Sequence, residues 1–126
     1  MNFGSIAVIS NNSQEFISIN HMGNVSSSSA VMVVSPPSTG EFILSNFPPN
    51  QRLFVSGQSL LPSSMSIQYS PEQFSLTDVD VPSVIFSDAS GSANLPVGGT
   101  LSTSGSGNNA YIDTDYSIRY QITVNY

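Results

Sequence analysis

The last eleven residues of the chain constrain its fold more than any other stretch. Residues 116–126 read YSIRYQITVNY, in which every second residue is apolar or aromatic and the residues between are polar. Side chains of a β-strand alternate between two faces, whereas a helix would scatter this pattern around its circumference. The stretch therefore predicts one half-buried strand, which is either a strand of a sandwich or a strand offered for pairing.

The rest of the chain repeats short strand-like runs that Ser, Asn, Gly and Pro separate. No 10-residue window has a helical apolar period, and the length of 126 residues fits one domain. We therefore predict a single all-β domain over residues 1–126, either a sandwich or a barrel. The predicted runs are residues 3–10, 15–20, 30–34, 41–47, 52–56, 64–70, 74–81, 83–87, 93–102 and the C-terminal stretch.

Three of these runs carry a more specific expectation. Residues 30–34 (AVMVV) are continuously apolar, which predicts burial on both faces or contact with a partner. Residues 64–70 (SMSIQYS) alternate cleanly between polar and apolar side chains, as a half-buried strand does. Residues 93–102 contain Pro96 and the pair Gly98 and Gly99, which predict a bulge or a sheet edge.

The composition excludes several classes of function. Charged residues make up 8% of the chain against about 25% in ordinary domains, with no Lys, no Cys and a net charge of −6. A chain this poor in cations is a poor ligand for nucleic acid. A polar but uncharged surface is typical of secreted proteins, so we expect an extracellular or cell-surface location. We expect neither a membrane span nor a signal peptide within this chain, because it has no 18-residue apolar run and no basic leader.

Residues that could carry catalysis or bind metal are sparse. His21 is the only His, no nucleophile motif accompanies it, and no phosphate-binding Gly loop is present. Two acidic pairs, Asp78 with Asp80 and Asp113 with Asp115, could add oxygens to a Ca²⁺ site, but acids in loops more often cap turns. We therefore predict no enzyme activity, no catalytic residue, no metal and no cofactor.

Several stretches together resemble a known family. They are residues 1–6 (MNFGSI), 54–57 (FVSG), 96–102 (PVGGTLS), Tyr116 and 122–126 (ITVNY). In this combination the chain resembles the exported bacterial domains catalogued as DUF4402, which open with an aromatic-Gly strand and end in a "VGGTL … Y … VTVNY" pattern. The resemblance covers nearly the whole chain. That family is similar in turn to spore-coat-protein-U and fimbrial-subunit sandwiches.

The resemblance implies an immunoglobulin-like (pilin-like) antiparallel β-sandwich of about 7–9 strands, exported from a bacterium. The approach to the last strand differs from the family pattern, because residues 114–118 read TDYSI where Gly-x-Tyr-x-Gly is usual.

The expected function is that of a structural subunit of an extracellular bacterial filament or surface assembly. Pilin-like sandwiches polymerise by strand addition, in which an extended segment of one subunit pairs within the next. The partners would be copies of the chain itself, with a secretion chaperone or usher, and the lack of Lys removes Lys–Asn cross-links. The expected subunit interface consists of the alternating apolar residues near the two termini, although ordinary sandwich strands alternate in the same way. These residues are Phe3, Ile6, Val8, Tyr120, Ile122, Val124 and Tyr126.

Two alternatives remain open at the level of sequence. A carbohydrate-binding adhesin would use the polar loop before the last strand, with Tyr111 as its best exposed aromatic residue and Asp113 and Asp115 beside it. A virion decoration protein would share the all-β, Lys-poor, Ser-rich character.

Overall fold

Every regular element in the described part of the chain is a β-strand. The computed structural model describes residues 1–61 and 63–126. The strands are antiparallel and form a sandwich-like fold, which confirms the predicted fold class. In chain order they are β1 (Ser5–Val8), β2 (Phe16–Ile19), β3 (Val25–Ser27), β4 (Val31–Ser35), β5 (Gly40–Leu44), β6 (Arg52–Ser59), β7 (Met65–Ser66), β8 (Ser75–Asp80), β9 (Val84–Phe86), β10 (Ala93–Ser102), β11 (Tyr116–Ser117) and β12 (Tyr120–Asn125).

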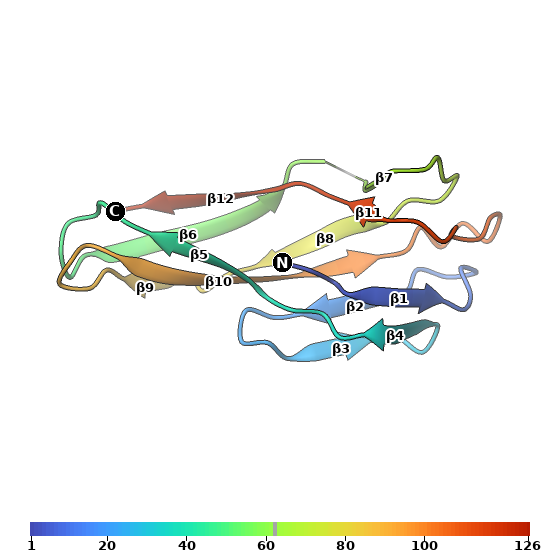
Figure 1. Cartoon of the computed structure of the whole chain (residues 1–126), viewed down its shortest axis with the longest axis horizontal. Helices are drawn as coiled ribbons and strands as arrows, with labels where there is room; N and C mark the ends of the chain where they lie inside the picture. The colour runs from blue at the N-terminus through green and yellow to red at the C-terminus, as the bar shows by residue number, and fades with distance from the viewer. Residues whose placement is uncertain (62) are drawn as a thin grey trace.

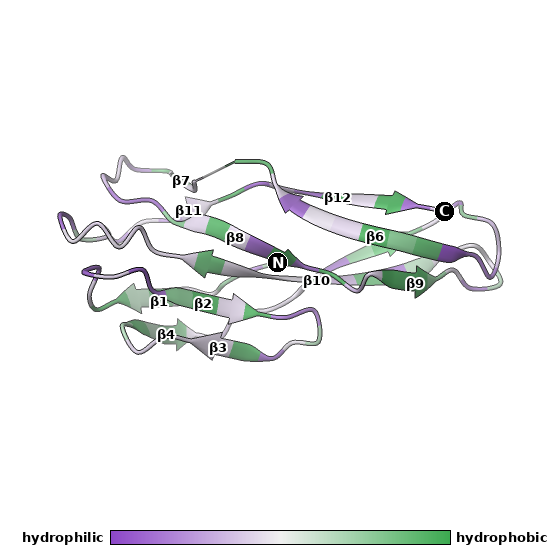
Figure 2. Cartoon of the chain, turned by 180° about the vertical axis from the view of Figure 1, so that it is seen from behind, coloured by the Kyte–Doolittle hydropathy of each residue, from purple (hydrophilic) through white to green (hydrophobic). Residues whose placement is uncertain are grey.

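The strands run roughly along the long axis of an elongated molecule (Figure 1). The C-terminus lies at one end of this axis, whereas the N-terminus lies near its middle. The view from behind shows that the strands carry both apolar and polar residues, with β9 apolar along its length (Figure 2). Burial alternates from residue to residue along β6 and β12, so one face of each of these strands lies against the interior.

The longest strand, β10, is central to the fold. Residues 93–97 pair with β5, and residues 99–102 lie between β2 and β8. Residues 99–102 are therefore central, whereas residues 93–97 have a free edge among the described strands, as the sequence predicted, and a register shift against β8 between Thr100 and Leu101 is consistent with the predicted bulge. Pro96 falls in the half that pairs with β5 alone among the described strands, where its missing N–H removes no bond to a second neighbour.

Two glycines allow β10 to sit between its neighbours. A side-chain carbon on Gly98 would clash with the carbonyl oxygen of Ile19 and lie 2.5 Å from the carbonyl carbon of Asn20. A carbon on Gly99 would lie 2.8 Å from the carbonyl oxygen of Asp78. The backbones of β2 and β8 thus come too close for any side chain at these positions, which explains the Gly pair physically.

The interior contains two apolar clusters. The first is built on Ile17, Val31, Phe74 and Leu101, and the second on Val55, Leu95 and Val97. The chain passes from one sheet to another between β8 and β9, because β8 pairs with β10 and β9 pairs with β6. Such a crossing joins two sheets into one sandwich-like unit.

The predicted C-terminal strand is divided in two. β11 pairs with β7, and β12 pairs with β6, with Ile118 and Arg119 between them. The division arises because the segment that pairs with this stretch stops pairing after Ser59, at the end of β6, and pairs again only from Met65, at the start of β7. The predicted alternation is confirmed, since even-numbered residues from 116 to 124 are half-buried and odd-numbered residues are exposed. The ten predicted runs become twelve described strands through this split and through β3, which no predicted run contains, so the described strands exceed the expected 7–9.

Two other predicted strands differ from expectation in their burial. In β4, Met32 and Val34 are exposed, so burial on both faces is wrong, and the alternative of contact with a partner stays a prediction. The run at residues 64–70 contributes only β7, and its apolar residues Met65, Ile67 and Tyr69 face solvent. Apolar content alone does not show how a strand pairs. Among the described strands β4 pairs only with β1, and β7 pairs only with β11, so each is an edge strand of a two-stranded sheet.

Replacing Gly98 by Ala is expected to destabilise the protein by about 2–4 kcal/mol, because the added methyl group meets backbone atoms that cannot move independently. The exposed neighbour Asn94, on the same strand, provides the control. Asn94→Ala should change stability by less than about 0.5 kcal/mol. Urea unfolding followed by circular dichroism measures both, and equal midpoints would contradict the close approach.

Ile122→Asp is expected to destabilise the protein by about 3 kcal/mol or more, because Ile122 packs against the second cluster and a carboxylate there would lose water. Thr123→Asp on the exposed face of β12 should change stability by no more than about 0.5 kcal/mol. Thermal melting distinguishes them, and similar losses would contradict the assignment of the two faces.

Candidate functional site

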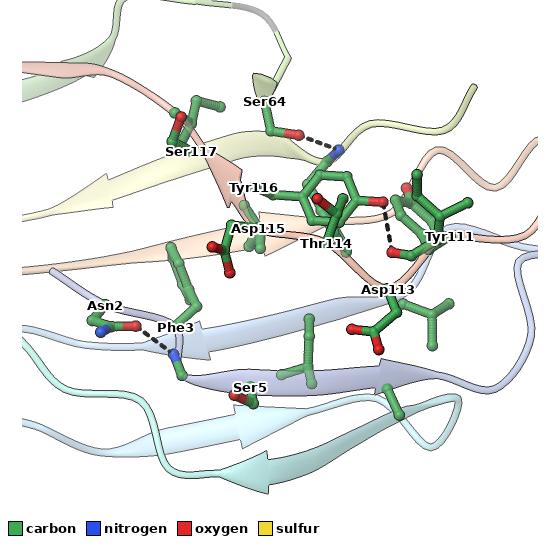
Figure 3. Close-up of a pocket in the computed structure, with 18 of the residues that line it drawn as sticks. Asn2, Phe3, Ser5, Ser64, Tyr111, Asp113, Thr114, Asp115, Tyr116 and Ser117 are labelled. Carbon is green, nitrogen blue, oxygen red and sulfur yellow. Dashed lines mark hydrogen bonds between the residues drawn. The ribbon is translucent and has the colours of Figure 1, made fainter. Parts of the chain in front are cut away.

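A groove lies between β1 and the segment that leads into β12. It has a volume of about 810 Å³, and residues 1–8 form one side while residues 111–118 and Tyr120 form the other. We call it the β1 groove. In Figure 3, Phe3 projects from the β1 side towards Asp115 and Tyr116 on the opposite side.

The β1 groove is open because two strand edges face each other across it without pairing. Among the described strands, β1 pairs only with β4, and a bridge between Asn2 and Ser38 continues on that side. β11 likewise pairs only with β7. The outer edge of a strand presents N–H and C=O groups that can accept another strand. The groove therefore has the geometry of a sheet from which one strand is missing.

The floor of the β1 groove is the first apolar cluster. Phe74 and Leu101 are buried and also line the groove. Phe3, Ile6 and Val8 pack against the same cluster from the β1 side. An apolar floor beneath two free strand edges suits a segment whose side chains alternate between apolar and polar.

An aromatic cluster forms the opposite wall. Tyr111 stacks on Phe74 with ring centroids 4.2 Å apart, and Tyr116 meets Phe74 edge-on at 5.0 Å. The Tyr111 hydroxyl donates to the carbonyl of Gln73 at 2.9 Å and accepts from the N–H of Ser104 at 3.0 Å. Burial raises the pKa of this phenol above its ordinary value. Tyr111 is therefore a fixed part of the wall and not the exposed aromatic residue that the sequence suggested.

Glu72 fixes the loop that precedes this wall. Its side chain is only 4% exposed, and its carboxylate accepts hydrogen bonds from the hydroxyls of Ser104 and Ser106. Asn11 ties the same loop from the other side, because its amide donates to Ser104 and accepts from the N–H of Gly105. The hydrogen bonds from Ser104 and Ser106 lower the pKa of Glu72. Sequence reasoning missed this network, since a lone Glu beside Pro and Gln carries no pattern.

A second hollow, the β5 groove, lies between β5 and β12. Its volume is about 610 Å³, and Ile118 and Tyr120 line both grooves. β5 pairs only with β10 and β12 only with β6 among the described strands, so here too two free edges face each other. The free edge of the C-terminal segment consequently borders both grooves. Met1 lies against Gly40, close to the hydroxyl of Tyr120 where the grooves meet.

The structure brings together most of the residues that the sequence suggested for a subunit interface. Phe3, Ile6 and Val8 line the β1 groove. Ile122 and Val124 line the β5 groove, and Tyr120 lines both. Tyr126 lies apart, packed edge-on against Phe47 at 5.4 Å. Asp113 and Asp115 are exposed and line the β1 groove. The two terminal strands, β1 and β12, do not pair with each other.

His21 and Asp80 form a local pair elsewhere in the fold. Asp80 Oδ2 lies 2.8 Å from His21 Nδ1 and accepts the His21 backbone N–H at 2.7 Å. Within residues 1–61 and 63–126, no three His, Cys, Asp or Glu side chains come together in a group that could hold a metal ion. Nor does any helix of sufficient length and apolarity to cross a membrane occur in the described chain.

The fold defines an antiparallel all-β protein whose most developed surface feature is a pair of grooves between free strand edges. Its sequence matches the family model described as "Domain of unknown function (DUF4402)" over residues 1–126. The chain therefore belongs to the DUF4402 family, as the resemblance predicted. No curated protein and no solved structure matches it.

The stability of the protein should fall in acid partly through Glu72. Its pKa lies below the ordinary value of 4.5. The hydrogen bonds to its carboxylate are therefore complete above that pH and are lost as the pH falls through the lowered pKa. From about pH 5 to about pH 3, the melting temperature of Glu72→Gln should fall less than that of the wild type. Glu41→Gln, at an exposed position on β5, should keep the wild-type dependence.

Proposed function

We propose that this protein is a structural subunit of an extracellular bacterial filament or surface assembly. Copies of the chain assemble without covalent bonds by adding a β-strand of one copy to the β1 groove of the next. The observation that carries the proposal is the pair of free strand edges, on β1 and on β11, above an apolar floor.

Strand addition suits this groove in both its hydrogen bonding and its packing. Main-chain groups of an added strand would pair with the two edges, and alternate side chains would enter against Leu101 and Phe74. Residues 1–8 line the groove, and an added strand could pair along the four residues of β1, which span about 13 Å at about 3.3 Å per residue. Covering apolar surface contributes about 25 cal/mol per Å², so filling the groove stabilises both copies.

The composition is consistent with an extracellular role. A surface with no Lys and few charges is typical of secreted β-proteins. A secretion chaperone or usher would cover the groove until assembly, because an exposed apolar groove with free edges promotes uncontrolled pairing.

The contacts of Tyr111 argue against the carbohydrate-binding alternative, for which it was the main candidate residue. One face of Tyr111 is covered by Phe74, and its hydroxyl is engaged with Gln73 and Ser104. A sugar that stacks on an aromatic ring needs a free ring face. The acids Asp113 and Asp115 remain accessible, but no free aromatic face accompanies them from this loop.

Assembly should depend on the apolar side chains on the β1 side of the β1 groove. Ile6→Ser places a hydroxyl where an added strand would pack, and it should raise the concentration needed for assembly about tenfold or more, which corresponds to about 1.4 kcal/mol. Ile9→Ser, at an exposed position just beyond β1, should assemble as the wild type does. Electron microscopy and light scattering measure assembly, and circular dichroism verifies the fold of each variant.

Thr114→Glu tests the same groove from its other side without altering the core clusters. It should also block assembly while leaving the melting temperature close to that of the wild type. A wild-type chain that remains a monodisperse monomer at high concentration would contradict the proposed function.

A further inference from the structure

The two outer faces of the sandwich-like fold carry opposite charges beside exposed apolar side chains. We infer that the outer face of β6 and β9 in one copy packs against the outer face of β5 and β10 in the next, with Arg52 of one copy paired to Glu41 of the other. The inference rests on the proposed function, in which copies of the chain assemble, and adds a second contact beside strand addition.

The first surface, which we call the β6 face, is the solvent-exposed side of β6 and β9. It carries Arg52 and Phe54 on β6 and Val84 and Phe86 on β9. In the ladder Phe54 lies opposite Val84 and Arg52 lies opposite Phe86, so the four side chains adjoin on one face. Phe54, Val84 and Phe86 are 49%, 37% and 62% exposed. A contiguous group of exposed apolar side chains marks a surface that binds a partner.

Arg52 is held in place on this face without a charged partner in the described chain. Its guanidinium carbon lies over the ring of Phe86, 5.9 Å from the centroid. Within residues 1–61 and 63–126 no carboxylate forms an ion pair with it. It is also the only charged residue on β12, β6 and β9, the three strands of this sheet. An oriented, unpaired guanidinium beside apolar side chains suits a carboxylate of a partner, which it can bind through two parallel hydrogen bonds.

The second surface, the β5 face, is the outer side of β5 and β10 and offers that carboxylate. Glu41 and Ile43 stand two residues apart on β5 and lie opposite Pro96 and Asn94 of β10. Leu95 is fully buried in the second cluster, so its neighbours on either side, and the β5 residues paired with them, face outwards. Ile43 is 78% exposed, and Glu41 is exposed with no ion pair among the described residues.

Charge distinguishes the β5 face from the other exposed apolar surfaces. Outside the β6 face, Ile43 is the only large exposed apolar residue of the described chain with a carboxylate two positions away. Val79 packs into the second cluster, so Asp78 and Asp80 on either side of it extend the acidic outer face along β10. A basic face is attracted to this acidic one, whereas two β6 faces in contact would bring two Arg52 side chains together.

The spacing of the residues on the two faces agrees. Arg52 and Phe54 stand two residues apart on β6, as Glu41 and Ile43 do on β5. Side chains at this spacing share one face of a strand and lie about 7 Å apart. One alignment of the two strands therefore places Arg52 on Glu41 and Phe54 on Ile43 together.

The two faces lie on opposite sides of the molecule, so the contact can repeat. Val55 of β6 and Leu95 of β10 pack in the second cluster between the sheets, and the outer sides point away from each other. β5 lies nearer the viewer than β6 in Figure 1, whereas β6 and β9 lie nearer in Figure 2, the view from behind. A contact between two different faces is heterologous and continues from copy to copy, in a ring or an open array.

Charge reversal tests the contact in the Thr114→Glu background, which should form no filament but should still associate weakly and reversibly through the faces. Arg52→Glu would oppose two acids and Glu41→Arg would oppose two guanidinium groups, so each should weaken this association at least about tenfold. Both changes together keep the net charge of the background and should restore it. Sedimentation measures association, and circular dichroism verifies the fold, since both positions are exposed.

Introduced thiols report which faces meet, because the chain contains no Cys. Val84→Cys lies on the β6 face and Asn94→Cys on the β5 face, both at exposed positions. Mixed in equal amounts under mild oxidation, these two variants should form a disulfide-linked dimer at least about tenfold faster than either alone. The matched control, Val84→Cys mixed with Ile9→Cys at an exposed position off both faces, should show no such gain. Rapid linkage of Val84→Cys to itself would overturn the inference.

The outcomes separate the inference from the function on which it rests. If Thr114→Glu prevents assembly while charge reversal and cross-linking show no contact, only the inference fails. If Thr114→Glu assembles as the wild type does while charge reversal weakens association, strand addition fails and the face contact stands. If the wild type stays a monomer and no thiol pair links, both fail. Binding of the monomer to a glycan array that Phe86→Ser abolishes, with no contact between copies, would assign the β6 face to a sugar and overturn the inference.

Discussion

The close approach of β2 and β8 to the backbone of β10 is the constraint on which the rest of the structure depends. It is possible only because Gly98 and Gly99 carry no side chain where the neighbouring carbonyl groups lie. The first half of β10 pairs with β5, and the chain passes from β8 to β9, which pairs with β6 in another sheet. Both apolar clusters contain residues of β10, so a change at the Gly pair would disturb the two clusters together.

The grooves follow from this arrangement, because the remaining strands pair away from one another. β1 pairs with β4, and the C-terminal segment pairs with β7 and β6. The other edges of β1 and of the C-terminal segment are therefore free, above an interior that is already formed. The wall of the β1 groove is fixed by aromatic stacking and by the hydrogen bonds of Tyr111 and Glu72. A preformed wall lowers the entropy lost when a strand binds, which would favour the assembly that we propose.

Much of the fold and part of the site followed from local patterns. Alternation identified the half-buried face of β12 and hence the groove residue Tyr120, whereas Phe3 and Ile6 followed from their apolar character near the N-terminus. The same pattern at residues 64–70 predicted a half-buried strand, yet its apolar face meets solvent. Tyr111 and Glu72 lie in a loop-rich region where spacing carries no signal, so their roles depended on contacts with distant residues such as Asn11 and Phe74.

The sequence by itself determined which side chains share a face, because that property depends only on the period of an extended backbone. It also determined the Gly pair and the lack of charge. Only the tertiary structure decided which edges pair, since hydrogen bonds between strands join residues far apart in the chain and alternation is the same for any partner. The C-terminal stretch illustrates the division. Its two faces are those the sequence predicted, but its partners are β7 and β6, and its other edge remains open.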